Sequence, residues 1–138
     1  MATRLHVDKP GETTMERARI LLAEDDQTTR AVLTEALAAE GYEVHTANDG
    51  QDGLQALERF SPDLVLTDLH MPRVDGFQML RGIARLKPGL PVLVLTVSTN
   101  QMAETQARLL GALDVLQKPI NLDALLNLVA QLLAPRLA

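Results

Sequence analysis

The chain of 138 residues contains no cysteine. Disulfide bonds, thiol nucleophiles, zinc ribbons and iron–sulfur clusters are therefore excluded, and a reducing compartment is compatible with the sequence. Aromatic residues are almost as scarce, because Tyr42, Phe60 and Phe77 are the only three, and they offer little surface on which nucleic acid bases could stack. A formal net charge of -5 also argues against a general affinity for nucleic acids or anionic lipids, since both are polyanions.

Long apolar runs are absent too. Charged residues and the Pro10-Gly11 pair occupy the N-terminal region, which leaves no apolar core for a signal peptide. The leucine-rich stretch 120–134 is interrupted by polar residues and is shorter than the ~20 apolar residues that cross a bilayer, so we expect an amphipathic helix there. These absences predict a cytoplasmic protein without membrane insertion.

The composition of the chain is sufficient for one hydrophobic core. Hydrophobic residues make up 46% of the chain and charged residues 22%, a balance typical of soluble globular proteins. A chain of this length holds one domain. We expect residues 1–18 to form an N-terminal extension and residues 19–135 to form the domain, with no second domain in this chain.

Short apolar runs alternate with segments of helical periodicity from residue 19 onward. Five runs are expected to form strands, at residues 20–23, 43–47, 64–67, 91–95 and 113–116. The segments between them have apolar residues at i, i+3 and i+4 and end near glycine or proline, as amphipathic helices do. The sequence therefore predicts an α/β fold, a doubly wound five-stranded parallel sheet with helices on both faces. The second strand alternates polar and apolar residues, so we expect it at an edge.

Acidic residues follow two of these strands. Glu24, Asp25 and Asp26 come after the first strand, and Asp68 comes after the third. Carboxyl ends of parallel strands meet at one rim, where ligands of doubly wound sheets bind. Gathered carboxylates repel one another, and a hard cation such as Mg²⁺ would relieve that repulsion. The alternative interpretation is that Asp25 or Asp26 caps the next helix and Asp68 simply opens a loop.

The fourth and fifth predicted strands bring a hydroxyl and a cation to the same rim. Thr96 ends the fourth strand, and Lys118 follows the fifth. Lys118 is one of only three lysines in the chain and the only one expected at the rim. A cation and a hydroxyl that face a metal-bound carboxylate can hold an anion with several oxygens, as phosphoryl transfer requires.

The segment Asp68-Leu-His-Met-Pro-Arg-Val-Asp-Gly76 resembles the D-x-x-M-P-x-x-D-G motif of bacterial response-regulator receiver domains of the chemotaxis type. The acidic run, the threonine and the lysine-proline pair stand in the matching order, and the resemblance covers about residues 19–134. This resemblance implies a flavodoxin-like sheet with strand order 2-1-3-4-5, the order of this family.

Site roles follow from the resemblance position by position. Asp68 matches the aspartate that accepts the phosphoryl group, and Glu24 and Asp25 match the acidic pair that holds Mg²⁺, with Mn²⁺ as an alternative. His70 matches the position whose backbone carbonyl completes the metal shell.

The remaining matched positions lie on the last two strands. Thr96 and Lys118 match the hydroxyl and the cation that meet the phosphoryl oxygens. Pro119 is expected to follow a cis peptide bond, which is readily reached only before proline.

The function implied is that of a two-component switch. A sensor histidine kinase or a histidine phosphotransfer protein would donate the phosphoryl group to Asp68, and water would later remove it. The protein would thus catalyse its own aspartyl phosphorylation and dephosphorylation while serving mainly as a signalling switch. The resemblance also implies a face, made by the fourth helix, fifth strand and fifth helix, that forms a homodimer or binds an effector protein, and Leu128 is expected to be exposed there.

Two residues depart from the family pattern. Val115 stands three residues before the lysine, where an aromatic residue that turns inward on activation is common. Val97 follows the threonine, where a small residue is usual, and its branched side chain predicts slow dephosphorylation and poor use of small phosphodonors.

The sequence leaves three other interpretations open. A pseudo-receiver would have the fold and bind partners without phosphorylation. A haloacid-dehalogenase-type phosphatase is suggested by the run from Glu24 to Thr28, but Glu24 would have to be the nucleophile and the chain has no room for a cap domain. A flavin-binding flavodoxin is disfavoured because the loop after the first strand has no glycine.

Overall fold

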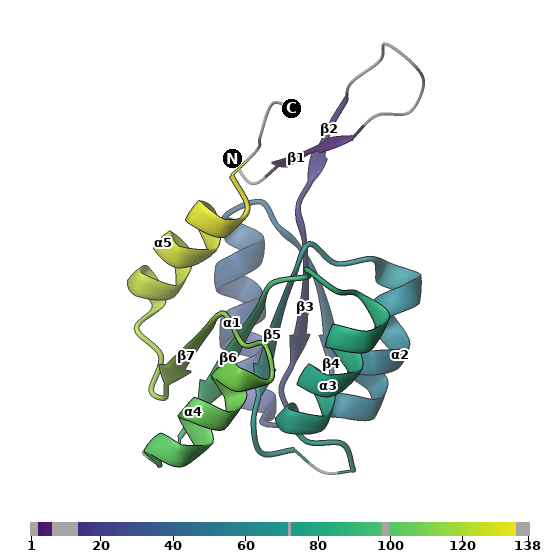
Figure 1. The fold of residues 1–138 in the computed structure, drawn as a ribbon. Helices are drawn as coiled ribbons and strands as arrows, with labels where there is room; N and C mark the ends of the chain where they lie inside the picture. The colour runs from purple at the N-terminus through teal and green to yellow at the C-terminus, as the bar shows by residue number, and fades with distance from the viewer. Residues whose placement is uncertain (1–2, 7–13, 72, 98–99, 135–138) are drawn as a thin grey trace.

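The computed structural model describes residues 3–6, 14–71, 73–97 and 100–134. Its main sheet is parallel and five-stranded, with the order β4-β3-β5-β6-β7 (Figure 1). The strands are β3 (Arg19–Ala23), β4 (Glu43–Ala47), β5 (Leu64–Asp68), β6 (Val92–Thr96) and β7 (Asp114–Gln117). Counted within this sheet, the order is 2-1-3-4-5, which confirms the predicted fold and places β4 at an edge.

Among the described elements, four helices connect successive strands of this sheet, and a fifth follows the last strand. They are α1 (Gln27–Ala39), α2 (Gly50–Phe60), α3 (Gly76–Leu86), α4 (Gln101–Leu109) and α5 (Leu122–Leu132). An aspartate or asparagine caps the N-terminus of each one by accepting a backbone N–H of the first turn. Because each helix begins after the carboxyl end of a parallel strand, these capped N-termini lie at the carboxyl rim of the sheet.

Alternate strand residues face two separate cores. Ile20 and Leu22 of β3 pack in the cluster that contains buried residues of α1 and α5. Leu21 and Ala23 pack in the opposite cluster, which contains residues of α2, α3 and α4. Every residue of the central strands β5 and β6 is buried, as strands covered on both faces require. The sheet is therefore a rigid base for the residues at its rim.

One feature was not predicted from the sequence, and one prediction was wrong. Residues 3–6 and 14–17 form strands β1 (Thr3–His6) and β2 (Thr14–Arg17), which pair antiparallel in a second, two-stranded sheet. In Figure 1 this hairpin lies at the end of β3 opposite the carboxyl rim. Leu128, expected to be exposed, is instead half-buried against the core of α1 and α5. The most exposed large apolar side chains in the described part belong to α4, where Met102 and Leu109 are each 81% exposed. None of the described helices combines the length and the hydrophobicity needed to span a membrane.

Candidate functional site at the carboxyl rim

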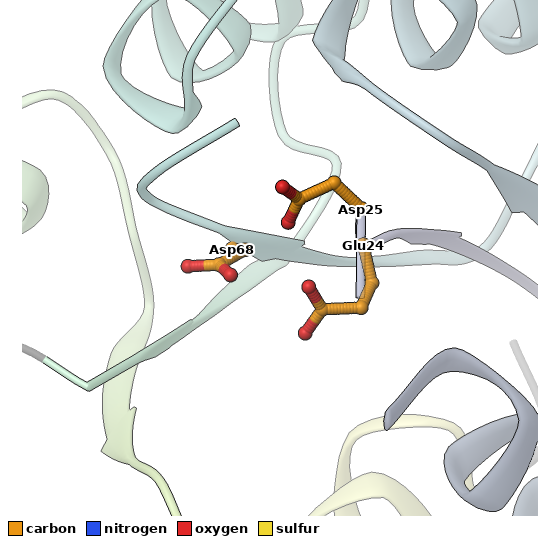
Figure 2. Close-up of side chains that lie close together, drawn as sticks. All are labelled: Glu24, Asp25 and Asp68. Carbon is orange, nitrogen blue, oxygen red and sulfur yellow. The ribbon is translucent and has the colours of Figure 1, made fainter. Parts of the chain in front are cut away.

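Three carboxylates converge at the carboxyl ends of β3 and β5. Glu24 and Asp25 directly follow β3, and Asp68 is the last residue of β5. One oxygen from each of these carboxylates lies within 4.8 Å of the other two. Figure 2 shows the three side chains pointing toward a common space. The structure therefore brings together the acidic residues that the sequence predicts at this rim.

Glu24 forms the buried floor of this cluster and is 0% exposed. Its backbone N–H donates to the carbonyl of Ala47 at 3.0 Å, which ties it to the neighbouring strand β4. One carboxylate oxygen accepts a hydrogen bond from Lys118, and the other accepts the backbone N–H of Asp26 at 3.2 Å. Burial raises the pKa of Glu24, and the hydrogen bond from Lys118 offsets only part of that rise.

Asp26 belongs to the helix rather than to the cluster. Its side chain is the N-cap of α1, and one oxygen accepts the backbone N–H of Thr29 at 2.8 Å and the Thr29 hydroxyl at 2.6 Å. These bonds hold the pKa of Asp26 below its ordinary value. The helix-capping interpretation is thus confirmed for Asp26, while Asp25 is the exposed member of the cluster.

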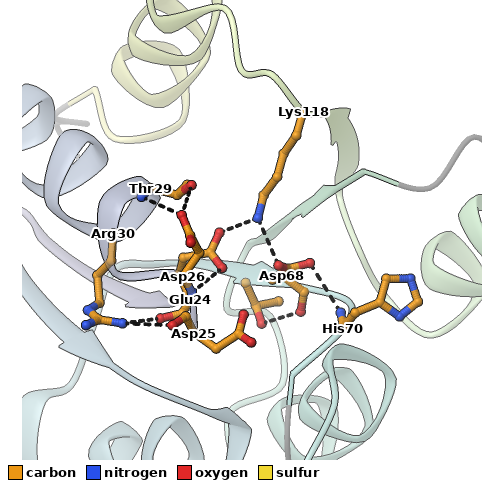
Figure 3. Close-up of polar contacts among 9 residues, drawn as sticks. Glu24, Asp25, Asp26, Thr29, Arg30, Asp68, His70 and Lys118 are labelled. Atoms are coloured by element: carbon orange, nitrogen blue, oxygen red, sulfur yellow. Dashed lines mark hydrogen bonds and ion pairs between the residues drawn. The ribbon is translucent and has the colours of Figure 1, made fainter.

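Lys118 reaches the cluster from the loop after β7 (Figure 3). Its Nζ donates to a carboxylate oxygen of Asp68 at 2.8 Å and also to Glu24. The side chain is only 13% exposed, and burial alone would lower the pKa of Lys118, but the bonds to Asp68 and Glu24 outweigh burial and raise it. The peptide bond from Lys118 to Pro119 is cis. The protonated amine is therefore held against two carboxylates.

Asp68 is held by its own loop. It is 7% exposed, and the carboxylate oxygen that does not face Lys118 accepts the backbone N–H of His70 at 3.2 Å. The imidazole of His70 is exposed, so this residue faces the site through its backbone. Gly76 closes the loop, where a Cβ atom would lie 2.4 Å from the carbonyl oxygen of Asp68. That close approach explains the glycine of the motif, and the aspartate before it, Asp75, is the N-cap of α3.

Thr96 and the two valines lie on the adjacent strands. Thr96 ends β6, is 2% exposed, and its backbone carbonyl accepts the N–H of Lys118 at 2.8 Å. Asp68 of β5 pairs with Leu95 of β6, so Thr96 lies one residue beyond the partner of Asp68. Val97 is 68% exposed at the rim, whereas Val115 is half-buried against the core of α2, α3 and α4.

Two arginines with contacts near the rim were not predicted from the sequence. Arg30 of α1 donates to backbone carbonyls of the acidic run. Arg73, in the loop after β5, has a positive φ of 65° and forms an ion pair with Asp49, the buried N-cap of α2. The cap of α2 could have been read from the Asn48-Asp49-Gly50 turn, but a pairing over 24 positions depends on the fold and leaves no local signal.

The donor set has a clear chemical preference. The cluster offers carboxylate oxygens and no histidine or cysteine, and oxygen ligands are those that Mg²⁺ prefers. Lys118 alone compensates the charge of Glu24 and Asp68, which leaves Asp25 without a cation in contact with its carboxylate among the described residues. The residues therefore fit a hard divalent cation beside an anion-binding lysine.

Comparisons with known proteins agree with this arrangement. The model of the family described as the response regulator receiver domain matches residues 20–130. The chain is 39% identical over 108 residues to the transcriptional regulatory protein GlrR of Escherichia coli, covering 78% of this chain and 24% of that protein. It is also 39% identical over 113 residues to the sensor histidine kinase RcsC of Salmonella typhi, covering 80% of this chain and 12% of that protein.

A solved structure of a chemotaxis protein has the same fold. The Vibrio cholerae chemotaxis protein CheY4 superposes with a TM-score of 0.79 at 29% identity, covering 84% of this chain and 98% of that one. The chain thus spans about a quarter of the length of the first curated relatives and nearly all of a chemotaxis protein.

Proposed function

This chain belongs to the response regulator receiver domain family and is the receiver domain of a two-component response regulator, and we propose that Asp68 is its phosphoryl acceptor. Receiver domains take their phosphoryl group from histidine kinases and generally bind Mg²⁺. The observation that carries the proposal is the contact of Asp68 with Lys118 inside a cluster of three carboxylates. A salt bridge that served stability alone would not need Asp25 beside it, whose carboxylate has no partner among the residues that the structure describes.

The proposed reaction is an in-line transfer. An oxygen of Asp68 forms the new O–P bond while the P–N bond of a phosphohistidine donor breaks, and the electron pair of that bond returns to the histidine nitrogen. Glu24, Asp25, Asp68 and the backbone carbonyl of His70 would hold Mg²⁺, which would neutralise charge on the phosphoryl oxygens when bound. Because Asp68 loses its negative charge on forming the acyl phosphate, Lys118 would move its hydrogen bond to a phosphoryl oxygen.

Thr96 would supply a hydroxyl to another phosphoryl oxygen from its buried place at the end of β6. Val115 cannot supply the aromatic ring that commonly turns inward in this family, so activation would depend on the loops after Asp68 and Thr96. Val97 is exposed at the rim, and its branched side chain would hinder small donors and the water that hydrolyses the acyl phosphate.

The proposal extends to the phosphodonor and to the partner that the receiver domain controls. The donor would be a sensor histidine kinase or a histidine phosphotransfer protein in the cytoplasm, and residues 19–135 would form the receiver unit. Its relatives include both transcriptional regulators and a sensor kinase, which are longer than this chain. Phosphorylation of Asp68 would therefore control a homodimer contact or an effector protein that differs between such systems.

The proposal is tested by intact-mass analysis. Wild type, Asp68→Asn and a control, Asp63→Asn, are incubated with Mg²⁺ and a phosphorylated histidine phosphotransfer protein or acetyl phosphate, with and without a chelator. We expect wild type and Asp63→Asn to gain the mass of one phosphoryl group only with Mg²⁺, and Asp68→Asn to gain none. Failure of wild type with every donor would instead favour the pseudo-receiver interpretation.

A further inference from the structure

Arg30 folds back over the start of α1 toward the acidic run. Its backbone N–H donates to the carbonyl of Asp26 at 2.9 Å, the first helical hydrogen bond. Its Nη1 atom donates to the carbonyl of Glu24 at 2.8 Å and, more weakly, to the carbonyl of Asp25 at 3.4 Å (Figure 3). A cation near a helix N-terminus opposes the helix dipole, so helix stability alone does not explain an arginine here.

The two acidic residues differ in how they are held. Glu24 is fixed by hydrogen bonds at its N–H, its carbonyl and both carboxylate oxygens. Asp25 is exposed, and within the described residues no hydrogen bond to its carboxylate is found. The direction of the Asp25 side chain therefore depends on its backbone. That backbone is held on both sides of its Cα atom, because the carbonyls of Glu24 and Asp25 share one guanidinium group.

We propose that Arg30 is a positioning residue for the divalent cation. By fixing the peptide units of Glu24 and Asp25, it keeps the Asp25 carboxylate turned toward Asp68 before a cation binds. This inference rests on the proposed function and extends it to a residue that touches neither the cation nor the phosphoryl group. Groups that orient metal ligands in this way have large effects on affinity when they are removed.

Arg30 acts on cation binding in two opposite ways, which makes the sign of its effect diagnostic. Its positive charge repels a divalent cation, so loss of the charge alone would strengthen binding. Its hydrogen bonds orient a ligand, so their loss would weaken binding. Both carbonyls accept from the one atom Nη1. Arg30→Gln removes the charge and shortens the side chain, while Arg30→Lys keeps the charge but places its nitrogen on a shorter side chain that cannot reach the same position between the two carbonyls.

The experiment measures the Mg²⁺ dissociation constant of the full chain by calorimetry and by NMR shifts of the Asp25 and Asp68 amides. The variants are Arg30→Gln and Arg30→Lys, and the control is Arg81→Gln on the exposed face of α3. We expect both Arg30 variants to weaken Mg²⁺ binding about tenfold or more. The control should stay within about twofold, as expected for a distant surface charge. Tighter or unchanged binding by Arg30→Gln would overturn the proposal.

Stability measurements distinguish a positioning role of Arg30 from a merely structural one. Melting temperatures are recorded for each variant, and the dissociation constant is measured where NMR shows a fully folded protein. If Arg30→Gln does not fold, Arg30→Lys decides, and Mg²⁺ binding by that variant equal to wild type would reject the positioning role. If wild type itself bound no Mg²⁺, the proposed function would fail first, whereas normal Mg²⁺ binding and phosphorylation with unaffected Arg30 variants would reject only this inference.

Discussion

Replacing Lys118 with methionine isolates the electrostatics of the site, because methionine keeps an unbranched side chain of similar reach and removes the charge. Glu24 is 0% exposed and Asp68 is 7% exposed, and both have Lys118 as their cation. Removing one member of a fully buried ion pair costs about 3–5 kcal/mol. This cluster opens to solvent at Asp25, and Glu24 can escape part of the cost by taking up a proton. We therefore expect a loss of about 1–3 kcal/mol in the free energy of unfolding at pH 7.

The loss in the free energy of unfolding caused by Lys118→Met should depend on pH, because Glu24 is a titratable partner of Lys118. Burial already raises the pKa of Glu24 above its unfolded value of 4.5, and losing the Lys118 bond would raise it further. Between the two values the folded state binds more protons than the unfolded state, so stability falls as the pH rises through that window. The penalty of Lys118→Met should thus be smaller at pH 5 than at pH 8. Mg²⁺ should restore more stability to the variant than to wild type, because the cation replaces the missing charge.

Urea unfolding followed by circular dichroism between pH 5 and pH 8 measures both effects. Lys87→Met is the matched control, since Lys87 is exposed at the end of α3. An equal loss at both pH values, insensitive to Mg²⁺, would refute the reasoning, because it would assign the loss to packing and not to charge.

Further predictions follow from the same rim. Gly76→Ala should cost more than about 2 kcal/mol in urea unfolding, because its Cβ atom would meet the Asp68 carbonyl at 2.4 Å. Asp49→Asn should weaken the ion pair to Arg73. The Asp52 N–H and then Arg73 lower the pKa of Asp49, so the stabilising effect of Asp49 should be lost as the pH falls through that lowered value, which an acid titration of unfolding measures. Val97→Ala should speed loss of radiolabel from the phosphoprotein several-fold. The raised pKa of Lys118 should make its stabilising effect persist to pH values above 10.5 and vanish beyond its folded pKa in alkaline unfolding.

The regular part of the fold could be predicted because its signals are local. Strands buried on both faces require continuous apolar runs such as residues 92–95 of β6, and capping residues mark the N-termini of the helices. The expected boundaries were displaced by about one residue. Pro91 has no N–H to donate to a ladder, and the strand begins at Val92. The strand order came from family resemblance, because periodicity does not specify which strands pair.

The missed features depend on contacts between distant segments. The hairpin of β1 and β2 was not predicted, because residues 1–18 stand outside the alternating strand and helix pattern of the domain. Arg30 and Arg73 have the same chemistry as any surface arginine until the fold sets their partners. Leu128 was expected to be exposed from its place outside the helical seam, but α5 packs closely enough to cover it. The motif predicts candidate site residues, but it does not predict Arg30 and Arg73, whose contacts depend on the fold.

Borohydride trapping tests most directly whether Asp68 itself carries the phosphoryl group. Borohydride reduces an aspartyl phosphate to homoserine, which tandem mass spectrometry locates in the sequence after proteolysis. The protein phosphorylated in the presence of Mg²⁺ should yield homoserine at position 68 and at no other acidic residue. Homoserine at position 25 or 26, or a phosphoprotein that yields none, would contradict the account.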